Sequence, residues 1–254
     1  MDPKSKPYYL FIRAADSMTV HDHFREGCSR QMCWDEENRL AGFSDCHNAG
    51  FYQYDVNGER TYKLTGERVL QNIGGQWYSH QILDNPTLYV SPYLVCTPQG
   101  YTKHYYAEAE RITSQLGKGQ FADVGTPVVG DSLVQVKLQE VTNGVDHPAT
   151  LTVPASSRFS YLDTLTDRQD SASTLFFYHP DHLGSASWIT NIYGRTIQHL
   201  YYLPWGEDFV DQRSTNWNAM YTFSAKEKDA ETGYSYFGSR YYSSYLSIWL
   251  RWTR

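Results

Sequence analysis

Apolar and polar residues alternate along short stretches in two parts of the chain. The stretches 51–55 (FYQYD) and 61–66 (TYKLTG) show a period of two. Aromatic-rich runs with turn residues at their ends follow at 175–190, 196–209 and 221–242. A period of two places successive side chains on opposite faces of a strand. The pattern therefore predicts short strands joined by tight turns.

A short unit recurs where these strands are expected to end. Residues 34–40 read WDEENRL and residues 54–60 read YDVNGER, an offset of 20 residues. A third copy at 190–196 reads TNIYGRT, and TPQGYTKHYY at 97–106, with Gly100 at its turn, is a weaker relative. The aligned positions are Trp34 with Tyr54, Asp35 with Asp55 and Asn191, Asn38 with Gly58 and Gly194, and Arg195 after the last glycine.

Each position of this unit has a physical interpretation. The aromatic ends a strand, and the Asp or Asn side chain accepts hydrogen bonds from backbone amides two residues on. The Gly or Asn position tolerates a positive φ. An Arg or polar residue then opens the returning strand. Each unit is thus a β-hairpin turn, and successive hairpins are expected to stack into a long sheet that coils on itself.

Residues 107–174 break this rhythm. The segment 130–144 favours a helix capped by Asp131 and ended by Asn143-Gly144. The same stretch also alternates at Val134, Val136 and Leu138, which is a strand pattern, but we expect the helix. The Ser, Thr and Asp content of 150–174 predicts a surface loop. We therefore divide the chain into an N-terminal segment 1–30, repeat strands 31–106, an insertion 107–174 and a C-terminal region 175–254.

Composition agrees with a strand-rich fold. The chain has 22 Tyr, 11 Phe, 7 Trp and 18 Gly among its 254 residues, which suits pleated surfaces and tight turns. A net charge of −6 without long basic runs argues against nucleic-acid binding. No apolar window approaches the ~20 residues of a membrane span. The start has no signal-peptide core of ~7–15 apolar residues, so nothing in this chain directs export.

The four cysteines give no metal motif. Cys28, Cys33 and Cys46 have the spacing C-x₄-C-x₁₂-C, followed by His47, and Cys96 lies far away. Zinc sites favour paired C-x-x-C or H-x₃₋₅-H spacings. We expect free thiols rather than a zinc site or a disulfide.

These residues together resemble the Rhs family of YD-repeat proteins from about residue 30 onward. The aromatic-Asp-x-x-Gly-Arg units resemble the YD repeat, and TPQGYTKHYY is similar to members from gut Bacteroidetes. The last third resembles the Rhs repeat-associated core domain. Its motifs, in order, are YHPDHLGS (178–185), YLPWGE (202–207), DAETG (229–233) and YFGSRYY (236–242).

The resemblance implies a mainly β fold in which a strip of hairpins curls into a shell. For this chain we expect a partial shell, with one short helix or loop insertion around 107–175. In toxin members the shell encloses a variable C-terminal toxin, and the core domain caps the shell end. Members are usually secreted or surface-displayed, and many serve in competition between bacteria. Related shells act in insecticidal toxin complexes and, in teneurins, in adhesion.

The chain departs from the family at its end. In toxin members the Arg-Tyr-Tyr motif leads into an Asp-Pro and then a self-cleavage segment. Here Arg240-Tyr241-Tyr242 is followed by Ser243-Ser244 and the sequence ends at LSIWLRWTR. We therefore do not transfer autoproteolysis or a toxin activity, and we interpret the ending as truncated before the cleavage segment.

The same motifs contain candidate residues for other kinds of chemistry. Two histidines and an aspartate, His179, Asp181 and His182, are residue types that bind metals. Asp181 is explained more simply as a cap for backbone amides of a turn. Ser185 lacks the second glycine of a nucleophile elbow. A catalytic carboxylate pair among the aspartates 181, 208, 211 and 229 needs a closeness that sequence does not show. Exposed aromatics suit contact with sugars.

The sequence thus predicts a non-enzymatic part of a YD-repeat shell that encloses or displays a polymorphic effector, without metal or cofactor. Its partners would be the rest of the shell and an enclosed toxin, at the cell surface or outside the cell. The alternatives are a surface adhesion or glycan-contact module and an autoproteolytic core. The residues expected to carry the structure are Trp34, Asp35, Asn38, Tyr54, Asp55, Gly58, Asp181, Gly184, Asn191, Gly194, Arg195, Gly206, Asp229, Gly233, Gly238 and Arg240.

Overall fold

The computed structural model describes residues 9–14, 17–22, 28–118, 149–152 and 174–250. It divides the chain into two compact units. Unit 1 comprises residues 1–86, 125–157 and 252–254, and unit 2 comprises residues 87–124 and 158–251. The boundary falls within strand β7, which has residues in both units.

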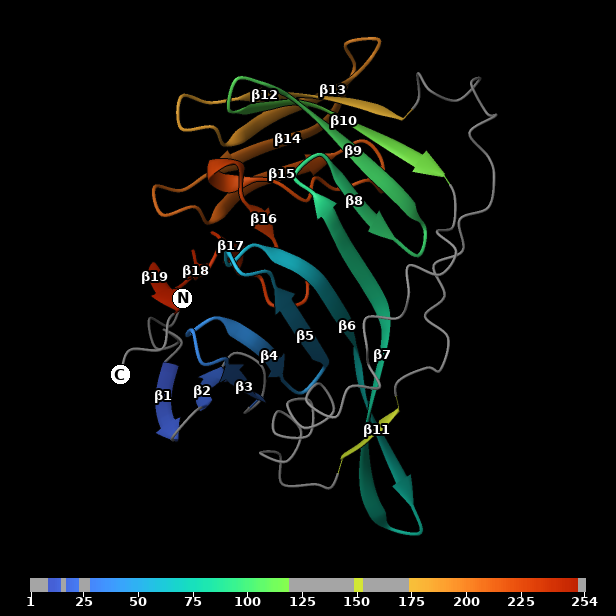
Figure 1. Cartoon of the computed structure of the whole chain (residues 1–254), viewed down its shortest axis with the longest axis vertical. Helices are drawn as coiled ribbons and strands as arrows, with labels where there is room; N and C mark the ends of the chain where they lie inside the picture. The colour runs from blue at the N-terminus through green and yellow to red at the C-terminus, as the bar shows by residue number, and fades with distance from the viewer. Residues whose placement is uncertain (1–8, 15–16, 23–27, 119–148, 153–173, 251–254) are drawn as a thin grey trace, which may run out of the picture. The chain divides into compact units, whose positions relative to one another are not determined.

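Unit 1 is built from consecutive antiparallel strands (Figure 1). The pairing follows the chain from β1 to β7, so each strand lies beside its sequence neighbours. This is the order that a series of hairpins produces. The strands are β1 (Tyr9–Ala14), β2 (Ser17–Asp22), β3 (Cys28–Trp34), β4 (Leu40–Ser44), β5 (Asn48–Tyr54), β6 (Arg60–Ile73) and β7 (Gln76–Ser91).

One strand of unit 1 corrects the sequence interpretation. β11 (Ala149–Thr152) pairs in parallel with β7, with Ala149 opposite Ser79 and Thr152 opposite Ile82. We predicted a loop for 150–174, yet its first residues, Thr-Leu-Thr, alternate as a strand requires. The predicted helix at 130–144 and the remainder of that loop lie outside the described residues.

Unit 2 continues the hairpin pattern from the end of β7 and adds a small second sheet. β10 pairs directly with β12, so a strand from within the predicted insertion 107–174 shares a sheet with the first strand after it. The predicted insertion begins at 107, but β10 extends the β9 hairpin to Lys118. The larger sheet has β8 (Leu94–Thr97), β9 (Gly100–Ala107), β10 (Glu110–Lys118), β12 (Leu175–Pro180), β13 (Ala186–Asn191), β14 (Thr196–Tyr202) and β15 (Asp208–Arg213). The small sheet has β16 (Glu227–Lys228), β17 (Ser235–Tyr236), β18 (Tyr241–Ser243) and β19 (Ile248–Leu250).

The predicted mainly β hairpin fold is confirmed. Among the described residues, the helical content is one short 3-10 turn, Phe223–Ala225. None of the helices described there is long and apolar enough to cross a membrane. The larger sheets do not close, because β1 pairs only with β2 and β15 pairs only with β14 among the described strands.

Each unit has its own apolar core. In unit 2, Ile189, Ile197 and Leu200 belong to one buried apolar cluster, in which Trp217 stacks on Phe176 at 4.0 Å between ring centroids. In unit 1, β4 departs from alternation because all five of its residues are buried. Burying a large apolar side chain contributes about 1.5–3 kcal/mol. The most deeply buried side chains of unit 1 are Met32, Leu40, Phe43, Tyr52, Leu64 and Leu83.

Candidate functional site

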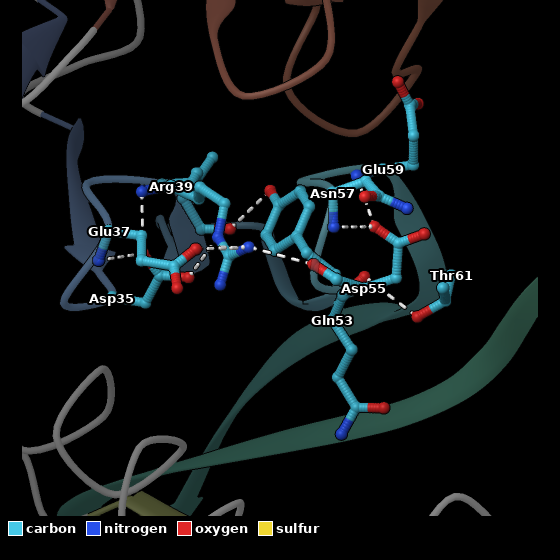
Figure 2. A network of polar contacts seen from close by, with 10 residues as sticks. Asp35, Glu37, Arg39, Gln53, Asp55, Asn57, Glu59 and Thr61 are labelled. Atoms are coloured by element: carbon cyan, nitrogen blue, oxygen red, sulfur yellow. Dashed lines mark hydrogen bonds and ion pairs between the residues drawn. The ribbon is translucent and has the colours of Figure 1, made fainter.

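The repeated unit forms a five-residue turn, which Figure 2 shows for its first two copies. In the first copy, Asp35 N donates to Arg39 O at 2.8 Å and Asn38 N donates to Asp35 O at 3.0 Å. The Asp35 Oδ1 atom accepts from Glu37 N at 3.0 Å and from Arg39 N at 2.8 Å. The aspartate side chain therefore satisfies two turn amides that the backbone alone would leave without acceptors.

The second copy repeats these bonds. Asp55 N donates to Glu59 O at 2.9 Å and Gly58 N donates to Asp55 O at 3.0 Å. Asp55 Oδ1 accepts from Asn57 N at 2.8 Å and from Glu59 N at 2.9 Å. Beside the turn, the Thr61 hydroxyl is 3.4 Å from the Gln53 carbonyl across the paired strands (Figure 2). Equal geometry from unequal sequences shows that the Asp and the fourth position define this turn.

Unit 2 contains the same turn twice. Asp181 Oδ1 accepts from Leu183 N and Ser185 N, both at 2.8 Å. Asn191 Oδ1 accepts from Tyr193 N and Arg195 N, both at 3.0 Å. The backbone hydrogen bonds also repeat. The amide of the first turn residue donates to the carbonyl of the fifth, and the amide of the fourth donates to the carbonyl of the first. The sequence motif predicts a turn at Asp181, but Asp181 was not aligned with the repeat.

The fourth turn residue has a positive φ in every copy. The values are 62° for Asn38, 82° for Gly58, 79° for Gly184 and 72° for Gly194. Left-handed backbone costs most L-residues about 1–2 kcal/mol, and Gly and Asn are the types that adopt it readily. The alternation between Gly and Asn at this position follows from that constraint.

A fifth turn, at 203–207, has the backbone of the repeat without its side chain. Leu203 N donates to Glu207 O at 2.8 Å and Gly206 N donates to Leu203 O at 2.9 Å. Gly206 has a φ of 85°, and a Cβ there would come within 2.6 Å of the Phe223 ring. Glycine is therefore required both by the backbone conformation and by the packing of Phe223.

Tyrosines link neighbouring turns. The Tyr54 hydroxyl donates to Leu40 O at 2.7 Å, and the Tyr202 hydroxyl donates to Ala186 O at 2.9 Å. In both cases a tyrosine just before one turn bonds the first residue after another turn. Burial, followed by the nearby Asp208 carboxylate, raises the pKa of Tyr202, so this hydroxyl keeps its proton. The aromatic position of the repeat is thus a hydrogen-bonding position as well as a packing one.

Arg39 adds a second link between the turns of unit 1. Its guanidinium pairs with Asp35 at 2.7 Å and donates to the Asp55 carbonyl at 3.1 Å. It also lies 5.2 Å from the centre of the Tyr54 ring. Trp34, which aligns with Tyr54 in the sequence, is buried and its Nε1 has no partner among the described residues. The two aromatics therefore differ in role despite their equivalent positions.

Asp45 holds a further turn that sequence reasoning missed. It is buried between β4 and β5, and its Oδ1 atom accepts from His47 N at 2.9 Å and from Asn48 N at 2.7 Å. Its other oxygen pairs with Arg30 at 2.8 Å. The neighbouring Cys46 is disulfide-bonded, which corrects the expectation of free thiols for this cysteine. The sequence signal that could have predicted this turn is an aspartate directly after an apolar strand.

Cys96 is a free thiol. Burial raises the pKa of Cys96 to about 11, which keeps this thiol protonated near neutral pH. A protonated, buried thiol is a poor nucleophile and packs as a small apolar group.

The remaining predicted structural residues lie in the small sheet of unit 2. Asp229 is fully buried, and Gly233, with a φ of 74°, donates to the Asp229 carbonyl at 2.7 Å. Gly238 has a φ of 78° in the turn between β17 and β18. The Arg240 guanidinium lies 4.4 Å from the centre of the Trp249 ring. These turns differ from the five-residue repeat.

His179 and Asp181, considered for metal binding, and Ser185, considered for nucleophilic catalysis, have structural partners, whereas His182 is exposed in the Asp181 turn. The His179 ring is 3.0 Å from the Thr190 hydroxyl, and Asp181 is occupied by turn amides. No cluster of three metal-ligating side chains occurs in the part of the chain that the structure describes. Ser185 is fully buried, and its Oγ accepts from Ser224 N at 3.0 Å.

The other aspartates near these motifs pair with cations. Asp208 lies 2.5 Å from the Lys228 ammonium. Asp211 pairs with Arg213, whose hydrogen bond lowers the pKa of the Asp211 carboxyl. A carboxyl with a lowered pKa stays ionised, the state suited to an ion pair rather than to general acid catalysis.

The sequence matches no protein-family model. It also matches none of the curated proteins with which it was compared. Solved structures of Tc toxin assemblies are similar in fold. The crystal structure of TcdB2-TccC3-Cdc42 matches with a TM-score of 0.53 and 16% identity over 87% of this chain. TcdB2-TccC3-TEV gives 0.51 and 18% over 87%, and a Photorhabdus luminescens Tc holotoxin pore with a substituted TccC3 gives 0.53 and 16% over 89%.

The matches cover 9% of the length of each of those chains. At this level of identity the likeness concerns the fold. The chain therefore has an Rhs-like β-hairpin fold of the kind found in Tc toxin chains.

Proposed function

We propose that this chain is a wall segment of an Rhs-type YD-repeat shell that encloses or displays a polymorphic effector in competition between bacteria. The main observation behind this proposal is the five-residue Asp or Asn turn, which occurs four times with the same hydrogen bonds. Each turn reverses the chain so that the next strand pairs with the last. A sequence built from such units extends a sheet and does little else.

The comparisons support this role. The chain is similar in fold to parts of multi-component Tc toxin assemblies. The motifs YHPDHLGS, YLPWGE, DAETG and YFGSRYY add the resemblance to the Rhs core domain. The partners in this proposal are the rest of the shell and an enclosed toxin domain.

The proposed location is the cell surface or the extracellular space. The disulfide at Cys46 supports this location. Disulfides form and persist in oxidising compartments and are rare in the cytosol. Expression in oxidising and reducing compartments, followed by thiol labelling of Cys46, provides the check. Full labelling of protein from an oxidising compartment would contradict the proposed location.

We also propose that the chain performs no chemistry of its own. Its candidate nucleophile is buried, and Asp181 and the Asp208 and Asp211 carboxylates are engaged in turns or ion pairs. Purified chain incubated for days should keep its intact mass of 29.4 kDa. A pair of fragments that add up to this mass would show autoproteolysis instead.

The DNA on both sides of the coding sequence tests the shell proposal. We expect a reading frame upstream with further aromatic-Asp-x-x-Gly units and an effector-like segment downstream. Unrelated genes on both sides would overturn the proposal. This observation needs no folded protein, so it is independent of any property of the isolated chain.

An adhesion or glycan-contact module is the second candidate, because unit 2 exposes aromatic side chains on β13 to β15. Trp188 and His199 stack at 3.8 Å between ring centroids, and Tyr201 lies edge-on to Phe209 at 6.2 Å. Trp188, Tyr201 and Phe209 are all largely exposed. Exposed aromatic faces of this kind can stack on sugar rings.

A glycan array separates the two candidates. If this face binds sugars, Trp188→Ala and Tyr201→Ala should each abolish the signal, whereas Tyr93→Ala, an exposed tyrosine on the β7–β8 turn, should retain it. An array without signal for the unaltered chain would eliminate the glycan candidate and leave the shell proposal intact.

A further inference from the structure

A cleft of about 330 Å³ lies in unit 2 between the β9–β10 hairpin and the Asp181 turn. Its walls are mainly apolar or aromatic, with Tyr178, Leu183, Tyr221 and Ala225 among them. Arg111 contributes a cation to the same lining. Small-molecule sites in proteins typically occupy about 300–1,000 Å³ and combine apolar walls with a few polar groups.

Arg111 is buried to an unusual degree for a cation, with 9% of its surface exposed. Its guanidinium lies 3.3 Å from the centre of the Tyr221 ring and 5.1 Å from the centre of the Tyr106 ring. Its Nη2 atom donates to the Tyr106 hydroxyl at 2.6 Å. Aromatic faces attract a cation, but each contributes only about 0.5–2 kcal/mol. These contacts thus hold the Arg111 guanidinium in place but do not neutralise its positive charge.

No carboxylate in the described part of the chain forms an ion pair with Arg111. The Nε atom is buried without an acceptor there, and the bond to Tyr106 is the one hydrogen bond from the guanidinium to described residues. The Asp181 carboxylate is taken up by turn amides. Glu110 also lines the cleft, but its side chain is exposed.

The neighbouring histidine adds no second positive charge. His104 packs edge-on to Tyr221 at 5.0 Å and contacts the Ser114 hydroxyl at 2.8 Å. Burial, assisted by the nearby Arg111, lowers the pKa of His104 to about 3, so this ring is neutral near pH 7. Among the described residues, Arg111 is consequently a buried positive charge without a carboxylate partner beside a mainly apolar cleft. Buried charges without a partner are costly, and a bound anion relieves that cost.

We propose that this cleft binds a carboxylate carried on an apolar or aromatic body, with Arg111 recognising the charge. A guanidinium matches the planar geometry of a carboxylate, and besides the buried Nε, the Nη1 atom has no hydrogen-bond partner among the described residues. The apolar walls suit a hydrophobic body. Phosphate fits less well, because one arginine among apolar groups offers it too few donors. This proposal does not depend on the shell proposal.

Two sources share this chemistry: a free aromatic acid, and the C-terminal carboxylate of a peptide ending in an apolar residue. Calorimetry with the purified chain should use phenylacetate against phenylacetamide, and a tetrapeptide ending in Phe against its C-terminal amide. Inorganic phosphate completes the set. We expect at least one carboxylate to bind about tenfold more tightly than its neutral amide, since charge-assisted bonds are about twice as strong as neutral ones.

The pattern of binding identifies the source. Binding of the peptide alone indicates a chain terminus as the ligand, and binding of phenylacetate indicates a free acid. Equal affinity for acid and amide, preference for phosphate, or no binding of either carboxylate would overturn the proposal.

Substitutions locate the site. Arg111→Gln should remove the preference for acid over amide, whereas Arg195→Gln, at an exposed arginine of a turn, should leave it unchanged. Because Arg111→Gln alters a buried position, a second pair changes the exposed Leu183 at the cleft. Leu183→Glu should weaken carboxylate binding about tenfold by like-charge repulsion, and Leu183→Gln should have little effect. Unchanged affinity in both Leu183→Glu and folded Arg111→Gln would contradict the assignment.

Discussion

At the scale of single residues, the repeat is a set of conformational requirements more than a set of chemical groups. The fourth turn position needs a positive φ, and both Asn38 and Gly194 meet it. The first position needs a short side-chain acceptor, which Asp55 and Asn191 both provide. Charge is therefore not what selects these residues. Substitutions that keep the conformation should be tolerated, and those that remove it should be costly.

Gly194 gives the cleanest test of the backbone requirement. A Cβ there would meet no atom within 4 Å, so steric packing does not enter. Gly194→Ala should lower the unfolding free energy by about 1–2 kcal/mol because of its φ alone. Gly194→Asn should cost less, since Asn38 adopts the same conformation. Urea unfolding followed by tryptophan fluorescence measures both, and an equal loss for the two variants would refute the argument.

His104 predicts a pH dependence of stability. Its pKa in the folded state is lowered to about 3, below its ordinary value of 6.5. The unfolded chain therefore binds a proton that the folded chain does not, and stability present above pH 6.5 is lost as the pH falls toward 3. Linkage puts the loss at about 2 kcal/mol between pH 7 and pH 5.

The control for this prediction is His104→Gln, which cannot titrate. Urea unfolding of both proteins at pH 7, 6 and 5 should show the steeper fall in the unaltered chain. Parallel pH profiles for the two proteins would show that other groups cause the acid sensitivity.

At the scale of elements, the turn is a unit whose side chain and backbone act together. Asp181→Asn should leave stability within about 0.5 kcal/mol, because Asn191 forms the same bonds in the next turn. Asp181→Ala leaves two turn amides without their acceptor and should cost about 1–2 kcal/mol. Thermal unfolding of the two variants distinguishes them. Equal destabilisation would mean that the negative charge, rather than the acceptor, is what the turn uses.

Many of the turns and strands could be predicted from the sequence, and the features that could not be predicted have physical causes. The Asp-x-x-Gly-Arg spacing predicted the turns after Trp34, Tyr54 and Thr190, because local side chains determine them. The turn at Leu203 escaped alignment because it uses backbone bonds and a glycine without the acceptor side chain. The burial of β4 on both faces comes from neighbouring strands, which no local pattern reports.

The candidate binding cleft shows the same limit more clearly. Arg111, on the β9–β10 hairpin, and Leu183, in the Asp181 turn, are brought together by the pairing of β10 with β12. In sequence, Arg111 lies inside the segment 107–174 that we had assigned to an insertion, and Leu183 lies beyond the end of that segment. Nothing in a single sequence distinguishes Arg111 from the other arginines, because what marks it is burial without a carboxylate partner among the described residues. Such a site follows from tertiary pairing alone.

At the scale of the whole molecule, the edges of the sheets decide behaviour in solution. β1 and β15 each pair on one side only among the described strands. β15 carries Asp208, Asp211 and Arg213, charges of the kind that discourage edge-to-edge pairing. β1 reads YLFIRA, with a single charge in six residues. Unprotected edges of this kind are templates for association with another chain.

We therefore expect the isolated chain to dimerise or aggregate, and to do so through β1. Ile12→Lys should reduce the mass-average size measured by light scattering, since charge on an edge strand opposes pairing. Phe209→Lys, on the already charged β15, should change it little. A chain that is monomeric before any substitution would show that its edges are protected, and would remove one physical reason for expecting neighbouring shell strands beside it.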